Sequence, residues 1–127
     1  MDWITSTVDA FGQALGIQGL SLDEDGLLAL QLEDGAELAI QDLRSSGEPE
    51  LLVALTKACS SDPVSALRSA LRASDFRHSP HWTLQVGLDD QDLVVGVRLP
   101  IGSVMLSSLE EAVDHVLHIH READHGH

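Results

Sequence analysis

A set of acidic and histidine residues near the C-terminus has a spacing that could bind a metal ion. Four of them recur at i, i+4, i+7 and i+11, which places them on one face of a helix. Nothing in the sequence supplies the partners that orient such ligands, and chain ends commonly fray. We therefore predict no metal and no other cofactor. The residues are Glu111, His115, His118 and Glu122, with His125 and His127 beyond them.

Other reactive groups have no partners that would activate them. Cys59 is the single cysteine, so no intrachain disulfide can form, and Lys57 is the only cationic residue near it in the sequence. The acidic groups at 23–25 and 89–92 lack the spacing of a calcium loop. There is no nucleophile-elbow sequence and no phosphate-binding glycine loop. We predict that the protein is not an enzyme.

The composition predicts one soluble domain over residues 1–127 with a core of leucine and valine. Of the 127 residues, 43% are hydrophobic, but only two Phe, two Trp and no Tyr are present. The net charge of -14 would repel a nucleic-acid backbone. The N-terminus has neither a basic start nor a continuous apolar run, which argues against a secretion signal and against membrane insertion. A cytosolic location is the default expectation.

The acidic residues are unevenly distributed. Residues 1–50 hold eleven acids and one base, Arg44. Such an excess can serve solubility alone, or it can attract a basic or amphipathic partner. The sequence leaves both interpretations open.

The first half of the chain is expected to contain a helix, a hairpin and a strand. Ile4, Val8, Phe11 and Leu15 have helical spacing and predict a helix over residues 2–15. The runs 27–33 and 36–43 predict a hairpin turned at Asp34-Gly35. The apolar run 51–56 is read as a third strand, although its length would also suit a helix.

The second half is expected to contain a helix, a hairpin and a last helix. Asp62 is a predicted N-cap for a helix that starts at Pro63 and ends near Phe76. Residues 82–88 and 93–99 alternate with period two around a polar turn at 89–92. A last helix over 109–122 has Ser107 or Ser108 as a candidate cap, with acids in its first turn. The chain is therefore predicted to be α+β, with three helices on a five-stranded, mainly antiparallel sheet in the order α-β-β-β-α-β-β-α.

This element order in a small acidic chain resembles the class I type III secretion chaperones, the Tir-chaperone-like family. The second half carries the best match: the helix segment 66–71, the two strands 82–88 and 93–99, the pair Leu99-Pro100 and the final helix. The hairpin segments 27–32 and 37–40 match the first hairpin of the family. The resemblance covers nearly the whole sequence and contains no catalytic motif.

The resemblance implies a bacterial cytoplasmic homodimer without a nucleotide cofactor. It implies that the dimer binds the N-terminal segment of one or more type III secreted effectors in extended form and keeps that segment soluble and competent for export. The alternative is an adaptor or regulatory domain of the same fold that binds a folded partner. A chaperone would protect a segment that is unstable alone, whereas an adaptor would not.

Two sets of residues are predicted to bind these partners. An added strand needs an exposed sheet edge with apolar side chains beside it, and the first hairpin offers both. Leu27 and Ala29 lie on the opposite face to its other leucines, and Leu27 is either covered by the chain or faces a partner. The predicted effector-binding residues are Ile17, Leu28, Leu30, Leu32, Leu38 and Ile40. The predicted dimer-interface residues are Val64, Leu67, Ala70, Leu71 and Trp82. A helix that only covers the sheet, and a tryptophan in the core, remain alternatives for the second set.

Overall fold

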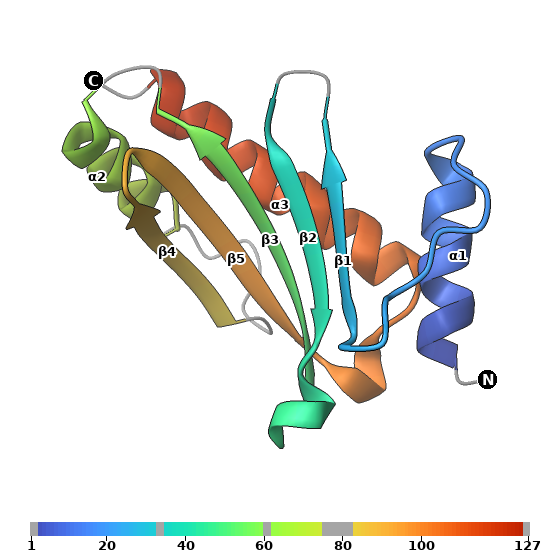
Figure 1. The fold of residues 1–127 in the computed structure, drawn as a ribbon. Helices are drawn as coiled ribbons and strands as arrows, with labels where there is room; N and C mark the ends of the chain where they lie inside the picture. The colour runs from blue at the N-terminus through green and yellow to red at the C-terminus, as the bar shows by residue number, and fades with distance from the viewer. Residues whose placement is uncertain (1–2, 33–34, 60–61, 75–82, 126–127) are drawn as a thin grey trace.

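The computed structural model describes residues 3–32, 35–59, 62–74 and 83–125, which form a layer of helices against one twisted sheet (Figure 1). The predicted α+β class and element order are confirmed. In chain order the elements are α1 (Trp3–Ala14), β1 (Leu27–Gln31), β2 (Glu37–Asp42), the 3-10 turn η1 (Leu43–Ser46), β3 (Glu50–Ala58), α2 (Pro63–Ser74), β4 (Thr83–Asp89), β5 (Asp92–Pro100), the 3-10 turn η2 (Ile101–Ser103) and α3 (Leu106–His125).

The five strands lie in the order β1-β2-β3-β5-β4, and every described pair is antiparallel. β1 and β4 are therefore the two edges. β3 lies at the centre and pairs along its whole length with β5, which is equally long. In Figure 1, α3 crosses behind the sheet, α2 lies toward the β4 edge and α1 lies beyond the β1 edge.

Alternation along the central strands separates the core from the uncovered face. Leu51, Val53 and Leu55 of β3 are at most 1% exposed and face the helices. The residues between them are only half-buried and face away. Burial of a leucine or valine side chain contributes about 1.5–3 kcal/mol, so these alternate positions fix which face of the sheet takes the helices.

The buried polar residue His120 connects α3 to the centre of the sheet. Its side chain is 4% exposed, and its Nε2 lies 2.7 Å from the carbonyl oxygen of Leu55. A carbonyl oxygen can only accept, so Nε2 carries the proton and donates it. This bond satisfies a polar group that would otherwise be costly to bury, and it sets the position of α3 along β3.

The two predicted helix starts have different outcomes. The start of α2 is confirmed: Asp62 accepts hydrogen bonds from the backbone nitrogen and the hydroxyl of Ser65, at 3.1 and 3.2 Å. The predicted caps of α3 are wrong, because the helix begins at Leu106 and both serines lie inside its first turn. Ser108 instead donates to the carbonyl oxygen of Ser103 at 2.9 Å. The predicted acids also fall beyond this first turn.

The turn between β4 and β5 is shorter than the polar run that predicted it, whereas the connection between β1 and β2, residues 32–36, is longer than the predicted two-residue turn. Asp89 and Asp92 pair within the sheet, which leaves a two-residue turn with Asp90 at φ +58°. In the first hairpin Gly35 has φ +87°, a conformation that glycine adopts without strain. The predicted turn residue Asp34 and the predicted helix end at Phe76 lie outside the described residues.

Candidate partner-binding surfaces

The outer side of β1 presents backbone groups that the sheet does not use. Asp42 donates to the carbonyl oxygen of Gly26, and Leu32 donates to that of Ala36, both at 2.8 Å. These bonds lie at the two ends of β1, and hydrogen-bonded pairs alternate along an antiparallel ladder. The backbone groups of Leu28 and Leu30 therefore point toward β2. Those of residues 27, 29 and 31 point toward the free edge.

The side chains predicted to bind an effector divide into two groups. Leu28 and Leu30 are half-buried and lie opposite Ile40 and Leu38 in the β1–β2 register. Leu32 is also half-buried against the core. Leu38 and Ile40, in contrast, are 2% and 0% exposed, so they belong to the core and no partner can reach them in this structure. Those two assignments are corrected: the apolar face of β2 lies under the helices.

Exposed apolar side chains continue from the end of α1 to the start of β1. Ile17 is 37% exposed, and Leu27, on the uncovered face of the sheet, is 38% exposed. Leu15, predicted as the last buried position of α1, lies beyond the end of the helix and is 50% exposed. The helix stops earlier because Gly16 adopts φ +83°. The predicted residue Ile17 therefore lies on an accessible apolar surface.

The α2 helix has an exposed apolar stripe, which we call the α2 stripe. Val64 is 50% exposed, Leu71 is 46% exposed and Leu67 is half-buried. Ala70, which was predicted at the same interface, is 0% exposed and packs in the core. Ala70 is therefore removed from the predicted interface. Trp82 lies outside the described residues.

A charged contact that the sequence analysis missed connects the start of α1 to the end of β2. Asp42 accepts from Arg44 at 2.6 Å from Nη2 and 3.0 Å from Nε. The guanidinium carbon of Arg44 also lies 5.7 Å from the centre of the Trp3 ring. Such a cation–π contact contributes about 0.5–1 kcal/mol at an exposed site. The spacing Asp-x-Arg at the end of a strand is a weak sequence signal of the Asp42–Arg44 pair. No sequence pattern indicates that Trp3 joins it.

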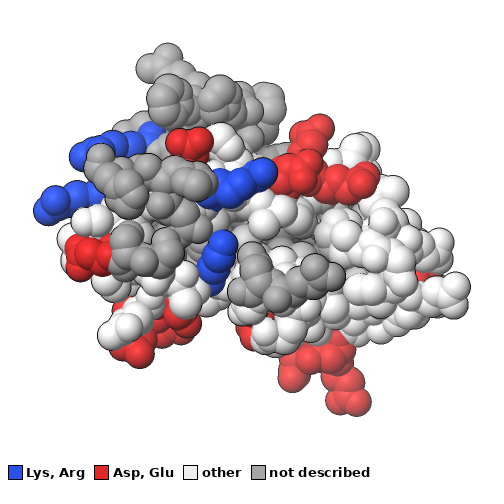
Figure 2. Space-filling model, turned by 90° about the horizontal axis from the view of Figure 1, so that it is seen from above, with Lys and Arg blue, Asp and Glu red and all other residues white. Residues whose placement is uncertain are grey.

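Charge differs between the two ends of the molecule. Figure 2 shows the blue Lys and Arg side chains of this face on the half that contains α2, whereas red acidic side chains occur on both halves. α2 itself carries Arg68 and Arg72. In the first 50 residues Arg44 is the one base, and it is paired with Asp42. Surfaces at the β1 end therefore have a negative potential.

Possible metal ligands do not converge in the part of the chain that the structure describes. No three His, Cys, Asp or Glu side chains in these residues gather in a geometry that could hold a metal ion. On the predicted face of α3, Glu111, His118 and Glu122 are exposed. No described helix is both long and apolar enough to cross a membrane.

The fold is that of the chaperones of type III secretion systems. The structure of the ExsC-ExsE complex matches it with a TM-score of 0.77 at 17% identity, over 99% of this chain and 96% of that chain. The HopA1-SchA chaperone-effector complex matches with a TM-score of 0.71 at 16% identity, over 99% of both chains. The Yersinia pestis chaperone SycH, in complex with a fragment of YscM2, gives 0.68 at 18% identity over 90% and 93%.

Sequence comparison identifies the family. Residues 6–122 match the Tir chaperone protein (CesT) family, and the chain belongs to that family. The predicted resemblance is thereby confirmed. No curated protein sequence matches the chain significantly.

Proposed function

We propose that this protein is a cytosolic chaperone that binds the N-terminal segment of one or more type III secreted effectors. The family match over nearly the whole chain carries the proposal, since the family is one of chaperones. Solved proteins with this fold include chaperone-effector complexes. The proposed role is to hold the segment in extended form, soluble and competent for export, without catalysis.

The β1 edge supports binding of an extended segment. The outward backbone groups of Ala29 and Gln31 can pair with a strand of any sequence, and neighbouring side chains would then select among sequences. The half-buried Leu28, Leu30 and Leu32 lie beside this edge, and Ile17 and Leu27 add exposed apolar area. Each side chain that becomes fully buried on binding would contribute up to about 1.5–3 kcal/mol.

The α2 stripe supports a homodimer. Isolated exposed apolar residues are common, but Val64, Leu67 and Leu71 recur at helical spacing on the side of α2 opposite its buried Ala66 and Ala70. A two-fold interface buries the same patch on both copies, and such a stripe can pack against itself. In this proposal the α2 stripe binds the second copy and the β1 edge binds the effector.

The proposal is tested by co-expressing the chain with N-terminal segments of secreted proteins from the same organism. Light scattering then gives the composition of whatever co-purifies. We expect two copies of the chain with one segment that is insoluble when expressed alone. Capture of folded proteins only, with every such segment left insoluble, would instead favour an adaptor.

Leu30→Asp is the variant that connects this test to the structure. Leu30 is half-buried at the edge strand, and an aspartate there would lose apolar contact with the segment and would be costly to bury beneath it. The matched control is Gln13→Asp, which adds the same charge at an exposed position of α1. We expect loss of co-purification for the first variant alone, with both variants still dimeric. Undiminished binding by folded Leu30→Asp would remove the β1 edge from the effector site.

A further inference from the structure

The free edge of β1 is closed at its start by Asp23. The backbone nitrogen of Asp23 donates to the carbonyl oxygen of Leu27 at 2.9 Å. Its Oδ1 accepts from the backbone nitrogens of Leu27 and Asp25, both at 2.9 Å. Both outward backbone groups of Leu27 are thus already used. A strand added to this edge can pair with Ala29 and Gln31, and it must leave the sheet when it reaches Asp23.

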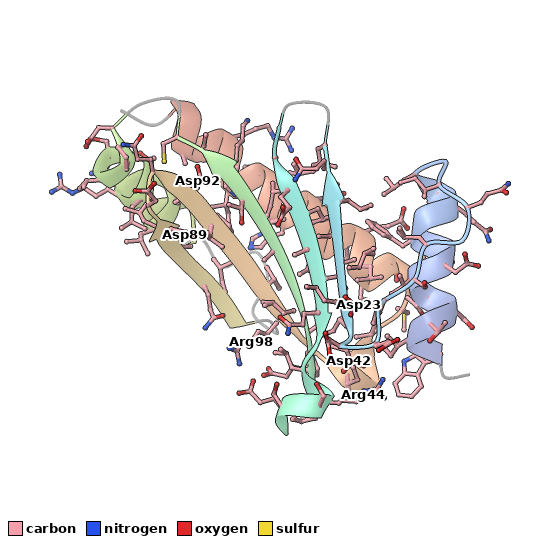
Figure 3. All side chains as sticks on the ribbon, viewed as in Figure 1. Asp23, Asp42, Arg44, Asp89, Asp92 and Arg98 are labelled. Carbon is pink, nitrogen blue, oxygen red and sulfur yellow. The ribbon has the colours of Figure 1, made fainter. Side chains whose placement is uncertain are left out.

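A cavity of about 280 Å³ lies beside this stop. It is open to solvent and is lined by the first turn of α1, the loop before β1, the end of β2 and η1. Figure 3 shows Asp23, Asp42 and Arg44 together at the end of the sheet where β1 begins. The residues that line the cavity are Ile4, Thr5, Leu22, Asp23, Glu24, Asp25, Gly26, Asp42, Arg44 and Ser45.

The lining combines apolar surface with an excess of negative charge. Four carboxylates line the cavity, and the one base among the lining residues, Arg44, is held by Asp42 and stacked on the Trp3 ring. Ile4 and Leu22 add apolar surface. Lysine and arginine have an aliphatic stem that packs on apolar surface and a cationic head that seeks carboxylates. The cavity matches both parts of such a side chain.

We propose that the segment bound at the β1 edge carries a lysine or arginine at its Asp23 end, and that this side chain occupies the cavity. The inference rests on the proposed function, because it concerns the same bound segment. Asp23 ends the pairing at a defined residue, so the next residue of the segment is the one that meets the cavity. Ala29 and Gln31 accept any strand through backbone groups, whereas the cavity selects a cationic residue at one position.

The first test uses fluorescent peptides with the core Thr-Val-Thr-Val, bound to the full chain and followed by anisotropy. Three peptides share this core and differ only in the two flanking residues. One has lysine at the N-terminal end, one has lysine at the C-terminal end and one has none, and norleucine, of similar length, replaces each missing lysine. Lysine at one of the two ends is expected to tighten binding about fivefold in about 0.02 M salt, and less in about 0.5 M salt. The preferred end also gives the direction of the added strand. Equal affinities for all three peptides would overturn the inference.

Two matched triple variants separate a local site from general attraction. Asp23→Asn with Glu24→Gln and Asp25→Asn removes three charges at the cavity, and asparagine keeps the oxygen that accepts from Leu27. The control changes Asp89, Asp90 and Asp92 to asparagine at the far hairpin turn. We expect the lysine preference to disappear only in the first variant. Its survival there, or an equal loss in both, would contradict the assignment.

A second measurement tests the cavity without any strand. n-Butylammonium reproduces the end of a lysine side chain, and 1-butanol, with the same four-carbon chain, is its neutral counterpart. In an NMR titration of the full chain, butylammonium alone is expected to shift the Trp3 indole and the Leu22 methyl resonances. If these shifts occur but none of the peptides binds, the cavity binds a cation, and the proposed strand addition at β1 is wrong. If butylammonium shifts neither, the cation site itself is wrong.

Discussion

The two ends of the sheet offer different surfaces to partners. At the β1 end, unused backbone groups lie among half-buried leucines and carboxylates. At the β4 end, α2 presents whole apolar side chains with Arg68 and Arg72 beside them. Backbone groups at an edge can bind an extended chain of many sequences, whereas a helical stripe requires a complementary rigid surface. In the proposed function, one small domain therefore binds an unfolded segment at its β1 edge and a folded second copy through α2.

The largest expected effect tests whether β2 belongs to the core or to the β1 surface. Ile40→Ala should lower the free energy of unfolding by about 3 kcal/mol, because Ile40 is fully buried. Its cross-strand neighbour Leu28 is half-buried at the edge, so Leu28→Ala should cost about 1 kcal/mol. Urea unfolding of both variants measures the difference. Equal losses of unfolding free energy would mean that Leu28 and Ile40 are equally buried.

Removing the α2 stripe should separate dimerisation from folding. Val64→Ser with Leu71→Ser changes side chains that are 50% and 46% exposed, so the fold should lose less than about 1 kcal/mol. The dimer should weaken about a hundredfold, since several buried apolar groups are lost from each copy. Sedimentation velocity measures this change. Met105→Ser, at a residue 56% exposed outside α2, is the control, and an equal shift there would remove the stripe from the interface.

Blocking the β1 edge should affect the effector segment alone. Gln31→Pro removes a backbone N–H that faces outward, which an edge strand tolerates. With the segment found by co-expression, binding measured by calorimetry should weaken about tenfold, by the loss of one hydrogen bond and steric conflict. Gln31→Thr keeps the N–H and should bind normally. A Gln31→Pro protein that is a folded dimer and binds at full affinity would exclude pairing at this residue.

The smallest expected effect compares the ion pair beside the β1 surface with an ion-pair network near the start of the central strand β3. Arg44→Lys loses the paired contact with Asp42 and the stacking on Trp3, and should cost about 0.5–1 kcal/mol. Arg98→Lys is the counterpart in β5, where Arg98 contacts Glu48 at 2.5 Å and Glu50 at 3.4 Å. Thermal unfolding should show that added salt weakens both contributions. A loss at Arg44 that salt does not change would mean that packing on Trp3 dominates.

Sequence patterns predicted the elements better than the faces that they present. Period two placed β4 and β5, and helical spacing placed α1 and α3 to within a few residues, because burial on one side forces these repeats. The first hairpin and β3 were predicted instead from apolar runs between turn signals. The same pattern could not say which side of the first hairpin is covered. β1 has leucine on both faces, so Leu38 and Ile40 were predicted to contact a partner, although both are buried in the hydrophobic core.

The missed features depend on contacts between segments distant in the sequence. The stacking of Trp3 on Arg44 joins residues 41 positions apart, and no local pattern predicts it. The hydrogen bonds by which Asp23 closes the β1 edge had a partial signal in the sequence. Asp23 precedes Asp25-Gly26 and a strand, and an aspartate that accepts from backbone N–H groups two and four residues ahead is a known turn signal. Its consequence for strand addition required the register of the sheet.

The position of Trp3 gives the molecule an optical reporter. The sequence contains two tryptophans, Trp3 and Trp82, so Trp82→Phe would leave all indole emission to the ring that stacks on Arg44. Indole emission depends on the charge and water around the ring. Filling of the neighbouring cavity could therefore be followed in real time by the intrinsic fluorescence of the chain, without a label on the protein or on its cargo.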